Sequence, residues 1–365
     1  MQLIVLLIVS IVHCAFLLCL LFGWLKTRNK KALITHPPVS VIVCAHNEKE
    51  NLSKYFKHLL EQNYKGEYEI VIVLDRCTDG SLEFIKNLPN KNIQIVEINQ
   101  TPNGWTGKKY AVTQGINTAK YDILAFTDAD CKVSPNWLSE MVQGLDNEKD
   151  IVIGCSPYFQ QNNLINSLIS YETTLTALLY VGFANIGLPY MGVGRNLLYR
   201  KKIFQQTGLE AHKQIISGDD DLFIQSVATS KNTTTIVSEP SLVFSEPPKK
   251  LQQWFNQKTR HYKTAPHYSI KTKILLTFFH FLYLFSLFLS IFVFGRENFV
   301  NCANFYPIIL FFAGILLFRW IFLITIAWKL KMRRQIITLP IWDVLYLFIG
   351  VILLIVSLFN KNKWQ

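Results

Sequence analysis

The stretch YDILAFTDADC, residues 121–131, sets the fold class of this chain. The apolar run Tyr121 to Thr127 predicts a buried strand. Asp128 and Asp130 follow directly, so this strand carries two carboxylates to its C-terminal end. In open α/β sheets that end lies at the edge where ligands bind. Acidic pairs at strand ends are also common in solvated loops, so the surrounding sequence must decide between the two interpretations.

Strands and helices alternate along the chain before this triplet. The continuous apolar runs of the first two strands are typical of strands buried on both faces, and the alternation of strands and helices predicts a mostly parallel sheet flanked by helices. The expected strands are Val39–Cys44, Glu69–Leu74, Ile93–Ile98 and the strand before Asp128, and the expected helices are 51–62, 82–87 and 108–118.

Acidic residues follow three of these strands. Glu48 comes after the first strand, Asp75 and Asp79 after the second, and the triplet after the fourth. Because the carboxyl ends of parallel strands meet at one edge of the sheet, we expect these acids to converge on a single crevice. The alternative for Asp75 and Asp79 is a turn in which they make only local hydrogen bonds.

Apolar blocks flank this α/β region. Half of all residues are hydrophobic, and the excess lies in the blocks 1–24, 274–294, 305–328 and 339–359. Each block has the length needed to cross a bilayer, so we expect about four transmembrane helices. The first block has neither a basic segment before it nor a cleavage pattern after it, which favours an anchor at 1–25 over a cleaved signal.

Basic clusters beside the blocks predict the orientation of the chain. Lys26 to Lys31, Lys258 to Lys273 and Lys329 to Arg334 all fall on one face of a four-span protein, which the positive-inside rule makes cytoplasmic. Only Lys361 and Lys363 disagree. We therefore expect an integral protein of the cell membrane with a cytosolic domain at 38–250, a juxtamembrane segment at 251–273 and three further spans within 274–359.

The net charge of +12 includes these membrane-flanking clusters, so anionic lipid is the expected partner and nucleic acid is not. The seven cysteines are scattered and show no CxxC spacing, which argues against a zinc site or a disulfide framework. Reduced thiols are expected.

Six motifs in order resemble those of family 2 glycosyltransferases, especially membrane-embedded members such as hyaluronan, chitin and cellulose synthases and ceramide glucosyltransferases. The resemblance covers about residues 38–261 and implies a GT-A-like sheet. The motifs are PVSVIVCAHNE (38–48), VLDRCTDG (73–80), GWTGK (104–108), the triplet at 128–130, GDDD (218–221) and QKTRH (257–261).

The resemblance implies a nucleotide-sugar donor and a divalent cation, Mg²⁺ or Mn²⁺, which offsets the charge of the departing diphosphate. It makes Asp130 a metal ligand and places Asp128 on the ribose or on a metal-bound water. Asp75 matches the acid that reads the uracil edge, and Glu48 lies where the family contacts the nucleoside. Leu74 replaces the first acid of the family's frequent Asp-Asp pair.

Lys108, in the turn GWTGKK, is a candidate contact of the donor diphosphate. The alternative is a flexible turn that ends in solvated lysines. The turn lacks the complete GxxxxGK[ST] pattern, which argues against an ATPase.

The run Asp219-Asp220-Asp221 precedes a predicted helix, 222–228. Acids at this position also stabilise a helix N-terminus without any chemistry. Neighbouring carboxylates raise one another's pKa, which suits a general base. By analogy with the family, Asp220 is the expected base and Asp219 the next candidate. One base without a second, nucleophilic carboxylate implies direct displacement with inversion.

The QKTRH motif lies on a predicted helix that leads into the second span. Arg260 is a candidate for holding the diphosphate with its forked guanidinium, and Gln257 accompanies it. His261 stands where the family has Trp, so acceptor stacking is expected to differ. Trp254, seven residues earlier, is spaced to share the face of His261. The alternative is a basic collar beside the membrane.

Two further features bear on the acceptor. The stretch 164–194 is interpreted first as core helix and second as the lining of a lipid-facing groove, and Arg319 and Asp343 are intramembrane charges that need partners. The leading hypothesis is transfer of a sugar, from a UDP-sugar before other donors, to a lipid or lipid-linked acceptor. A processive polysaccharide synthase, a non-catalytic nucleotide-sugar-binding protein and a small-solute transporter are the alternatives. About 220 cytosolic residues disfavour the transporter.

Overall fold

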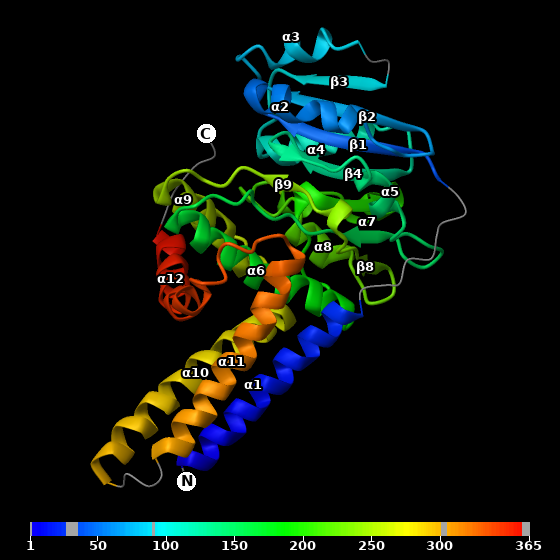
Figure 1. The fold of residues 1–365 in the computed structure, drawn as a ribbon. Helices are drawn as coiled ribbons and strands as arrows, with labels where there is room; N and C mark the ends of the chain where they lie inside the picture. Colours follow the sequence, from blue (N-terminus) through cyan, green and yellow to red (C-terminus); the bar gives the residue numbers. More distant parts are fainter. Residues whose placement is uncertain (1, 27–35, 90–91, 301–304, 360–365) are drawn as a thin grey trace.

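A seven-stranded sheet forms the centre of the domain (Figure 1). The structure is a computed structural model that describes residues 2–26, 36–89, 92–300 and 305–359. The basic residues at 28, 30, 31, 361 and 363 that entered the orientation argument lie outside these ranges.

The strand order is β3-β2-β1-β4-β7-β6-β8. Among the described strands of this sheet, only β7 runs antiparallel to its neighbours, so the predicted mostly parallel sheet is confirmed. The strands are β1 (Val39–Ala45), β2 (Tyr68–Asp75), β3 (Ile93–Ile98), β4 (Ile123–Asp128), β6 (Ile151–Ile153), β7 (Leu197–Arg200) and β8 (Thr233–Thr235), and a separate ribbon pairs β5 (Cys131–Lys132) with β9 (Phe244–Ser245).

Side chains alternate between the two faces of the sheet, and each face has its own helices. Val41 and Val43 of β1 enter one core with α2 (Lys49–Leu60), α3 (Ser81–Lys86) and α5 (Trp137–Val142). Ile42 enters the other core. Its helices are α4 (Gly107–Thr118), α6 (Leu164–Asn185), α7 (Lys201–Thr207), α8 (Asp221–Val227) and α9 (Leu251–Tyr262). The predicted elements before the triplet agree with the observed bounds to within two residues.

The register of the parallel strands brings their carboxyl ends to one level. Cys44 of β1 lies opposite both Val73 of β2 and Asp128 of β4. Asp75, two residues beyond Val73, therefore lies at the same edge as the first acid of the triplet. The sheet positions the acidic loops as the sequence predicts.

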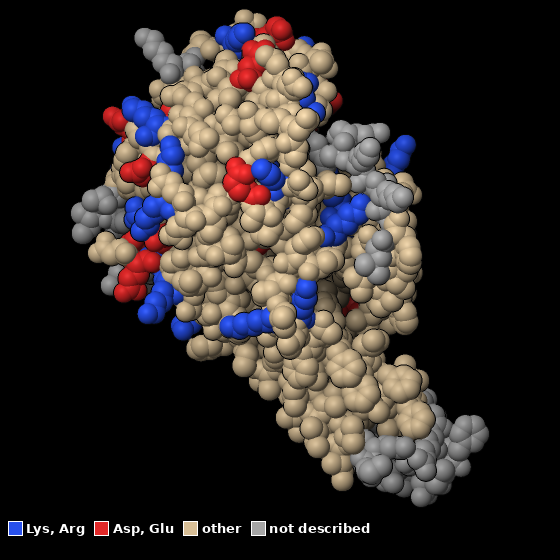
Figure 2. Space-filling view, turned by 180° about the vertical axis from the view of Figure 1, so that it is seen from behind, with Lys and Arg blue, Asp and Glu red and all other residues tan. Residues whose placement is uncertain are grey.

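Four described helices are long and apolar enough to cross a membrane, as predicted: α1 (Gln2–Leu25), α10 (Ile270–Val300), α11 (Phe305–Lys329) and α12 (Leu339–Phe359). α1, α10 and α11 run side by side away from the sheet (Figure 1). On the face shown in Figure 2, charged side chains gather on the domain and the described part of this bundle shows none. α10 continues to Val300, beyond the predicted end at Phe294.

The N-terminal helix α1 docks closely on α6. A Cβ atom added to Gly23 would lie 2.4 Å from the carbonyl oxygen of Gly182, so the two backbones touch where they cross. Beside this contact, the Trp24 indole donates a hydrogen bond to the carbonyl of Leu178 at 3.2 Å. The long apolar stretch before residue 186 is therefore a core helix that also holds α1.

Arg319 and Asp343 meet in a buried ion pair with 2.9 Å between Nη2 and Oδ1. The hydroxyls of Tyr171 and Tyr283 each donate to the same carboxylate at 2.6 Å. These four residues come from α6, α10, α11 and α12. The pair thus joins the domain to three of the apolar helices.

Candidate active site

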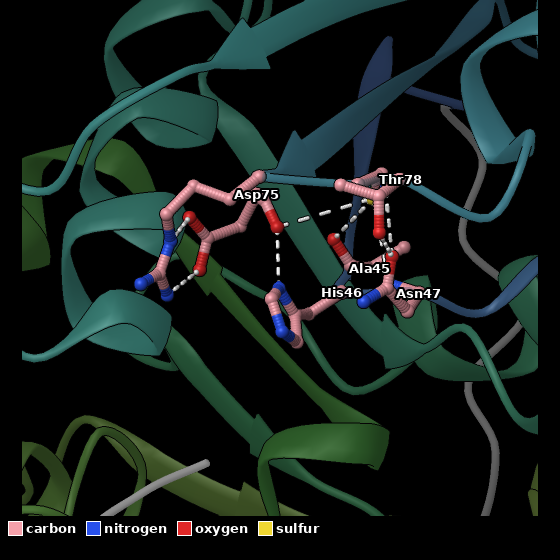
Figure 3. A network of polar contacts seen from close by, with 7 residues as sticks. Ala45, His46, Asn47, Asp75 and Thr78 are labelled. Carbon is pink, nitrogen blue, oxygen red and sulfur yellow. Dashed lines mark hydrogen bonds and ion pairs between the residues drawn. The ribbon is translucent and has the colours of Figure 1, made fainter.

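The loops after β1 and β2 are bound to each other at the edge of the sheet (Figure 3). The His46 Nδ1 lies 2.5 Å from the carbonyl oxygen of Asp75, and the Thr78 amide donates to the Asn47 side-chain oxygen at 2.8 Å. Asn47 itself adopts a φ of +57°, a conformation that Asn tolerates better than most residues. The two loops therefore form one fixed rim.

Asp75 lies at this rim, as predicted, and its carboxylate is already engaged. Nε and Nη2 of Arg76 donate to the two carboxylate oxygens at 2.8 and 2.9 Å. Gly107 passes over the pair, since a Cβ there would lie 2.5 Å from Arg76 Nη2 and 2.7 Å from Asp75 Oδ2. The GWTGK turn approaches the pair closely only because residue 107 is glycine.

Asp79 has a local structural role. It accepts hydrogen bonds from the amides of Lys49 at 2.8 Å and Ser81 at 3.0 Å, which lie at the starts of α2 and α3. The turn interpretation of the sequence therefore describes this acid, whereas Asp75 belongs to the rim.

The triplet offers a cluster of metal-ligating groups. One side-chain atom from each of Asp128, Asp130 and Cys131 lies within 4.8 Å of the others. Burial and the neighbouring charge of Asp128 raise the pKa of Asp130. Two carboxylates that repel one another in this way are suited to a hard divalent cation, which removes the repulsion. Burial raises the pKa of the Cys131 thiol, which leaves the two aspartates as the fitting ligands.

Glu48 faces the same cluster. Its pKa is raised chiefly by burial and further by the charges of Asp130 and Asp128, against the hydrogen bond from Asn51. That hydrogen bond is 2.6 Å long. The acids predicted to converge from the first and fourth strands are therefore close enough to interact.

Lys108 connects the triplet to the GDDD run. Its Nζ lies 3.2 Å from Asp128 Oδ1 and 3.4 Å from Asp219 Oδ2. Burial opposes the charge on Lys108, but these acids and Asp220 outweigh it and raise the pKa well above the ordinary value. A cavity is lined by Lys108, Asp128, Asp219 and Asp220, so motifs about 90 residues apart in the sequence share one site.

Asp220 is held by backbone amides. Gly194 N–H donates to its Oδ2 at 2.7 Å and Asp221 N–H to its Oδ1 at 2.8 Å. Burial, then the charges of Asp219 and Asp221, raise the pKa of Asp220 to about 7. A carboxylate with this pKa is poised to accept a proton near neutral pH.

The third acid of the run is structural. Asp221 is buried and accepts hydrogen bonds from the hydroxyls of Thr264 at 2.8 Å and Tyr268 at 2.6 Å. These partners follow α9, so Asp221 ties the acidic helix to the segment that enters α10.

The QKTRH residues lie on α9 and differ in their surroundings. Gln257 Nε2 lies 3.4 Å from the Tyr158 hydroxyl, and within the described residues the Arg260 side chain makes no ion pair. Desolvation by the surrounding protein, and then the charges of Lys258 and Arg260, lower the pKa of His261 well below its usual value. The imidazole of His261 is therefore neutral. Trp254 is buried in the core and does not share the exposure of His261.

Arg195 belongs to the site and the motifs gave it no role. Its guanidinium lies 4.4 Å from the centroid of the Tyr158 ring, with Nη2 donating to the Ser156 carbonyl at 3.0 Å. Its charge lowers the pKa of Asp130, against the effect of burial. The signal in the sequence is a lone arginine directly after two closely spaced glycines, Gly192 and Gly194.

Lys109 was also missed. It is 1% exposed, and its Nζ donates to the carbonyls of His212 at 2.6 Å, Ile215 at 2.9 Å and Ser217 at 2.9 Å. Those carbonyls belong to the loop that leads into the GDDD run. Lys109 therefore holds this loop beside α4, and the alternative interpretation of the turn, with solvated lysines, does not describe it.

Comparison with known proteins agrees with this geometry. Residues 40–208 match the family described as Glycosyl transferase family 2. The chain carries a family 2 glycosyltransferase domain. This domain is 32% identical over 116 residues to a dolichol-phosphate mannosyltransferase of Pyrococcus furiosus, and the match covers 32% of each chain.

A probable glycosyltransferase of Bacillus subtilis, YdaM, is 24% identical over 338 residues, which cover 86% of this chain and 76% of that one. The chain spans well under half the length of the first curated relatives it matches. Among solved structures, the mannosyltransferase PcManGT of Pyrobaculum calidifontis, in complex with GDP-Man and Mn²⁺, matches with a TM-score of 0.56 and 16% identity. The match covers 94% of this chain and 99% of that chain, and it shows that the fold is shared.

Proposed function

We propose that this protein is a membrane-bound inverting glycosyltransferase. It transfers a sugar from a nucleoside-diphosphate sugar, with a UDP-sugar as the first candidate, to a lipid or lipid-linked acceptor at the cytoplasmic face of the membrane. The observation that carries the proposal is the position of Lys108 between Asp128 and Asp219, because it puts the donor-side and acceptor-side acids around one cavity.

The proposed reaction is a single displacement. The Asp220 carboxylate removes the proton from the acceptor hydroxyl as its oxygen bonds to the anomeric carbon. The bond from that carbon to the diphosphate oxygen breaks, and its electron pair leaves with the nucleoside diphosphate. The two amides that hold the Asp220 carboxylate fix its direction, and its pKa of about 7 leaves much of it ionised at neutral pH.

Charge on the leaving diphosphate is met by cations. Asp128 and Asp130 would hold a divalent metal ion, which stabilises the diphosphate as a Lewis acid when it is bound. Lys108 keeps its positive charge in the same cavity, and Arg195 adds a fixed guanidinium beside Asp130. Arg260, free of ion pairs among the described residues, is a further diphosphate contact.

The nucleoside would lie along the rim of the β1 and β2 loops. Asp75 has both carboxylate oxygens on Arg76, so the base would meet a carboxylate and guanidinium together rather than a lone acid. Glu48 borders the triplet from the same rim. Because the base would meet both a carboxylate and a guanidinium, GDP-sugars should be tested as well as UDP-sugars.

A lipid acceptor is supported by the surroundings of α9. This helix lies next to the apolar helix α12 (Figure 1), and His261 offers a neutral ring in place of a flat indole. The name of the Pyrococcus relative, a dolichol-phosphate mannosyltransferase, points to the same acceptor class. Gln257, close to Tyr158, lies on the same helix and is assigned to the acceptor side.

The test is release of nucleoside diphosphate by the purified full chain in detergent, with a panel of UDP- and GDP-sugars, Mg²⁺ or Mn²⁺, and membrane lipid extract. We expect metal-dependent release with one donor and a lipid that carries one sugar. Long polymers would replace the acceptor assignment with a polysaccharide. No release with any donor, together with retained binding of a nucleotide sugar, would refute catalysis and favour a sensor.

A further inference from the structure

The last apolar helix does not run with the other three. α1, α10 and α11 form the bundle, whereas α12 lies apart from it beside α9 (Figure 1). The principal packing partners of α12 are α9 and α6, two helices of the glycosyltransferase domain. Length and composition qualify α12 as a span, but it packs more extensively on these two helices than on the bundle, which it meets mainly around the Arg319–Asp343 pair.

Contacts with the domain continue along α12. Near its start, the Trp342 indole donates to the Ser167 hydroxyl at 3.0 Å. One turn later, the ring of Tyr346 lies 5.6 Å from that of Tyr171. A further turn on, a Cβ added to Gly350 would lie 3.7 Å from the Tyr262 hydroxyl of α9. At least the first twelve residues of α12 therefore stay beside the domain.

Beyond these contacts, the rest of the helix is shorter than the hydrocarbon core is thick. Nine residues follow Gly350 in α12, which ends at Phe359. They span about 14 Å at 1.5 Å per residue. The hydrocarbon core of a bilayer is about 30 Å thick. A crossing would require α9 to enter the hydrocarbon, yet α9 carries Lys258, Arg260 and several amide side chains.

One face of α12 is apolar and uncovered. Asp343, the only charged residue of the helix, is buried and paired with Arg319. The opposite face exposes a stripe of apolar side chains at helical spacing: Ile341, Val344, Leu345, Phe348, Val351, Ile352 and Ile355. The exposed face of α11 is equally apolar, with Leu317 and Ile321 open. The same medium, lipid, fits both surfaces.

We propose that α12 is an interfacial helix. It lies along the membrane surface with its apolar stripe in the leaflet next to the glycosyltransferase domain, and the chain after it stays on the side of that domain. Such helices bury an apolar face at the boundary of headgroups and acyl chains. The partner is the lipid surface, and three helices cross it.

The charges around α12 agree with this arrangement. The segment before it carries Lys331, Arg333 and Arg334, and the Arg333 guanidinium lies 4.1 Å from the centroid of the Trp328 ring. Tryptophan and basic side chains together are typical of a membrane interface. Lys361 and Lys363 fall on the outside if α12 crosses and on the domain side if it does not. The second arrangement satisfies the positive-inside rule at every basic cluster.

The first test locates the chain after α12. A protease site and epitope are added after Gln365, with an equivalent site in the exposed loop at Lys231 as a marker of the domain side, and sealed vesicles of both orientations are treated with protease. We expect both sites to be cut in the same orientation. Cleavage of the two sites in opposite orientations would overturn the proposal.

The second test measures depth in the bilayer. Single cysteines replace Val344, Phe348, Ile352 or Ile355 in otherwise cysteine-free full-length protein, each carries a nitroxide, and lipid and aqueous relaxation agents report depth in vesicles. Leu310, Leu317 and Ile321 of α11 are the matched control. We expect similar shallow depths along α12 and a gradient along α11. A gradient along α12 would overturn the proposal, and so would labels shielded from lipid, which would indicate a protein partner such as a second copy.

Discussion

Replacing Asp220 with Asn tests the assignment of the base. The amide keeps the size of the side chain but cannot accept the proton of the acceptor hydroxyl, so kcat/KM should fall by about 10²- to 10⁴-fold. The pH dependence provides a second measure. With a pKa of about 7, about a tenth of Asp220 is ionised at pH 6 and about nine tenths at pH 8, so the wild-type rate should rise about tenfold over that interval.

The sign of this dependence follows from the causes of the pKa. Burial and the charges of Asp219 and Asp221 favour the protonated form of Asp220, so activity is lost as the pH falls through about 7. Asp219→Asn removes one of the charges that raise the pKa of Asp220, so the loss of activity on the acid side of the pH profile (the acid limb) should move to lower pH. Asp220→Asn should abolish the limb.

The assay is release of nucleoside diphosphate at saturating metal, from about pH 6 to 8. Glu210→Gln, an exposed acid earlier in the same loop region, is the matched control and should keep the wild-type profile. Thermal unfolding in detergent checks that each variant is folded. A folded Asp220→Asn enzyme with near-normal turnover and the original acid limb would refute the assignment.

Three further changes probe other parts of the structure. Asp130→Asn removes one of the two fitting metal ligands, so the Mn²⁺ concentration for half-maximal activity should rise at least about tenfold; equal Mn²⁺ binding by paramagnetic resonance in both proteins would contradict the ligand role. Lys109→Met deletes three hydrogen bonds to the loop before the GDDD run and should lower kcat by roughly 10- to 100-fold while tryptic cleavage of that loop speeds up. The exposed Lys231→Met is its control, and unchanged kcat and cleavage would show that the loop needs no such anchor. Arg319→Leu strands the buried Asp343 and should cost about 3–5 kcal/mol in detergent unfolding, with a smaller loss when Asp343→Leu is added; a double variant no more stable than the single one would show that the pair is not the cause.

The apolar runs and their alternation with helical segments were enough to predict the sheet. Runs such as Val39–Cys44 and Glu69–Leu74 form buried strands, and the shared direction of parallel strands then places Asp75 and Asp128 at one edge. The antiparallel β7 could not be anticipated, because its four residues carry no signal of direction.

Side-chain partners were harder to predict than positions. The sequence places Asp75 at the rim, but nothing in it says that the adjacent Arg76 folds back onto the carboxylate. Lys108 and Lys109 are adjacent lysines in the first turn of α4, where successive side chains point in different directions. Lys108 therefore faces the acids, and Lys109 faces the loop carbonyls. Trp254 and His261 share a helical spacing, but the packing of α9 buries only the first.

The close crossing of α1 and α6 has a consequence for synthesis. Gly23 meets Gly182, which the ribosome adds about 160 residues later. At about 5–20 residues per second, α1 waits on the order of ten seconds before its binding site exists. α10 and α11 emerge later still, so α1 has none of its helical partners while the domain folds. The three-helix bundle can therefore assemble only after the domain has been made. A fault in domain folding leaves α1 without its partners, as a target for membrane quality control.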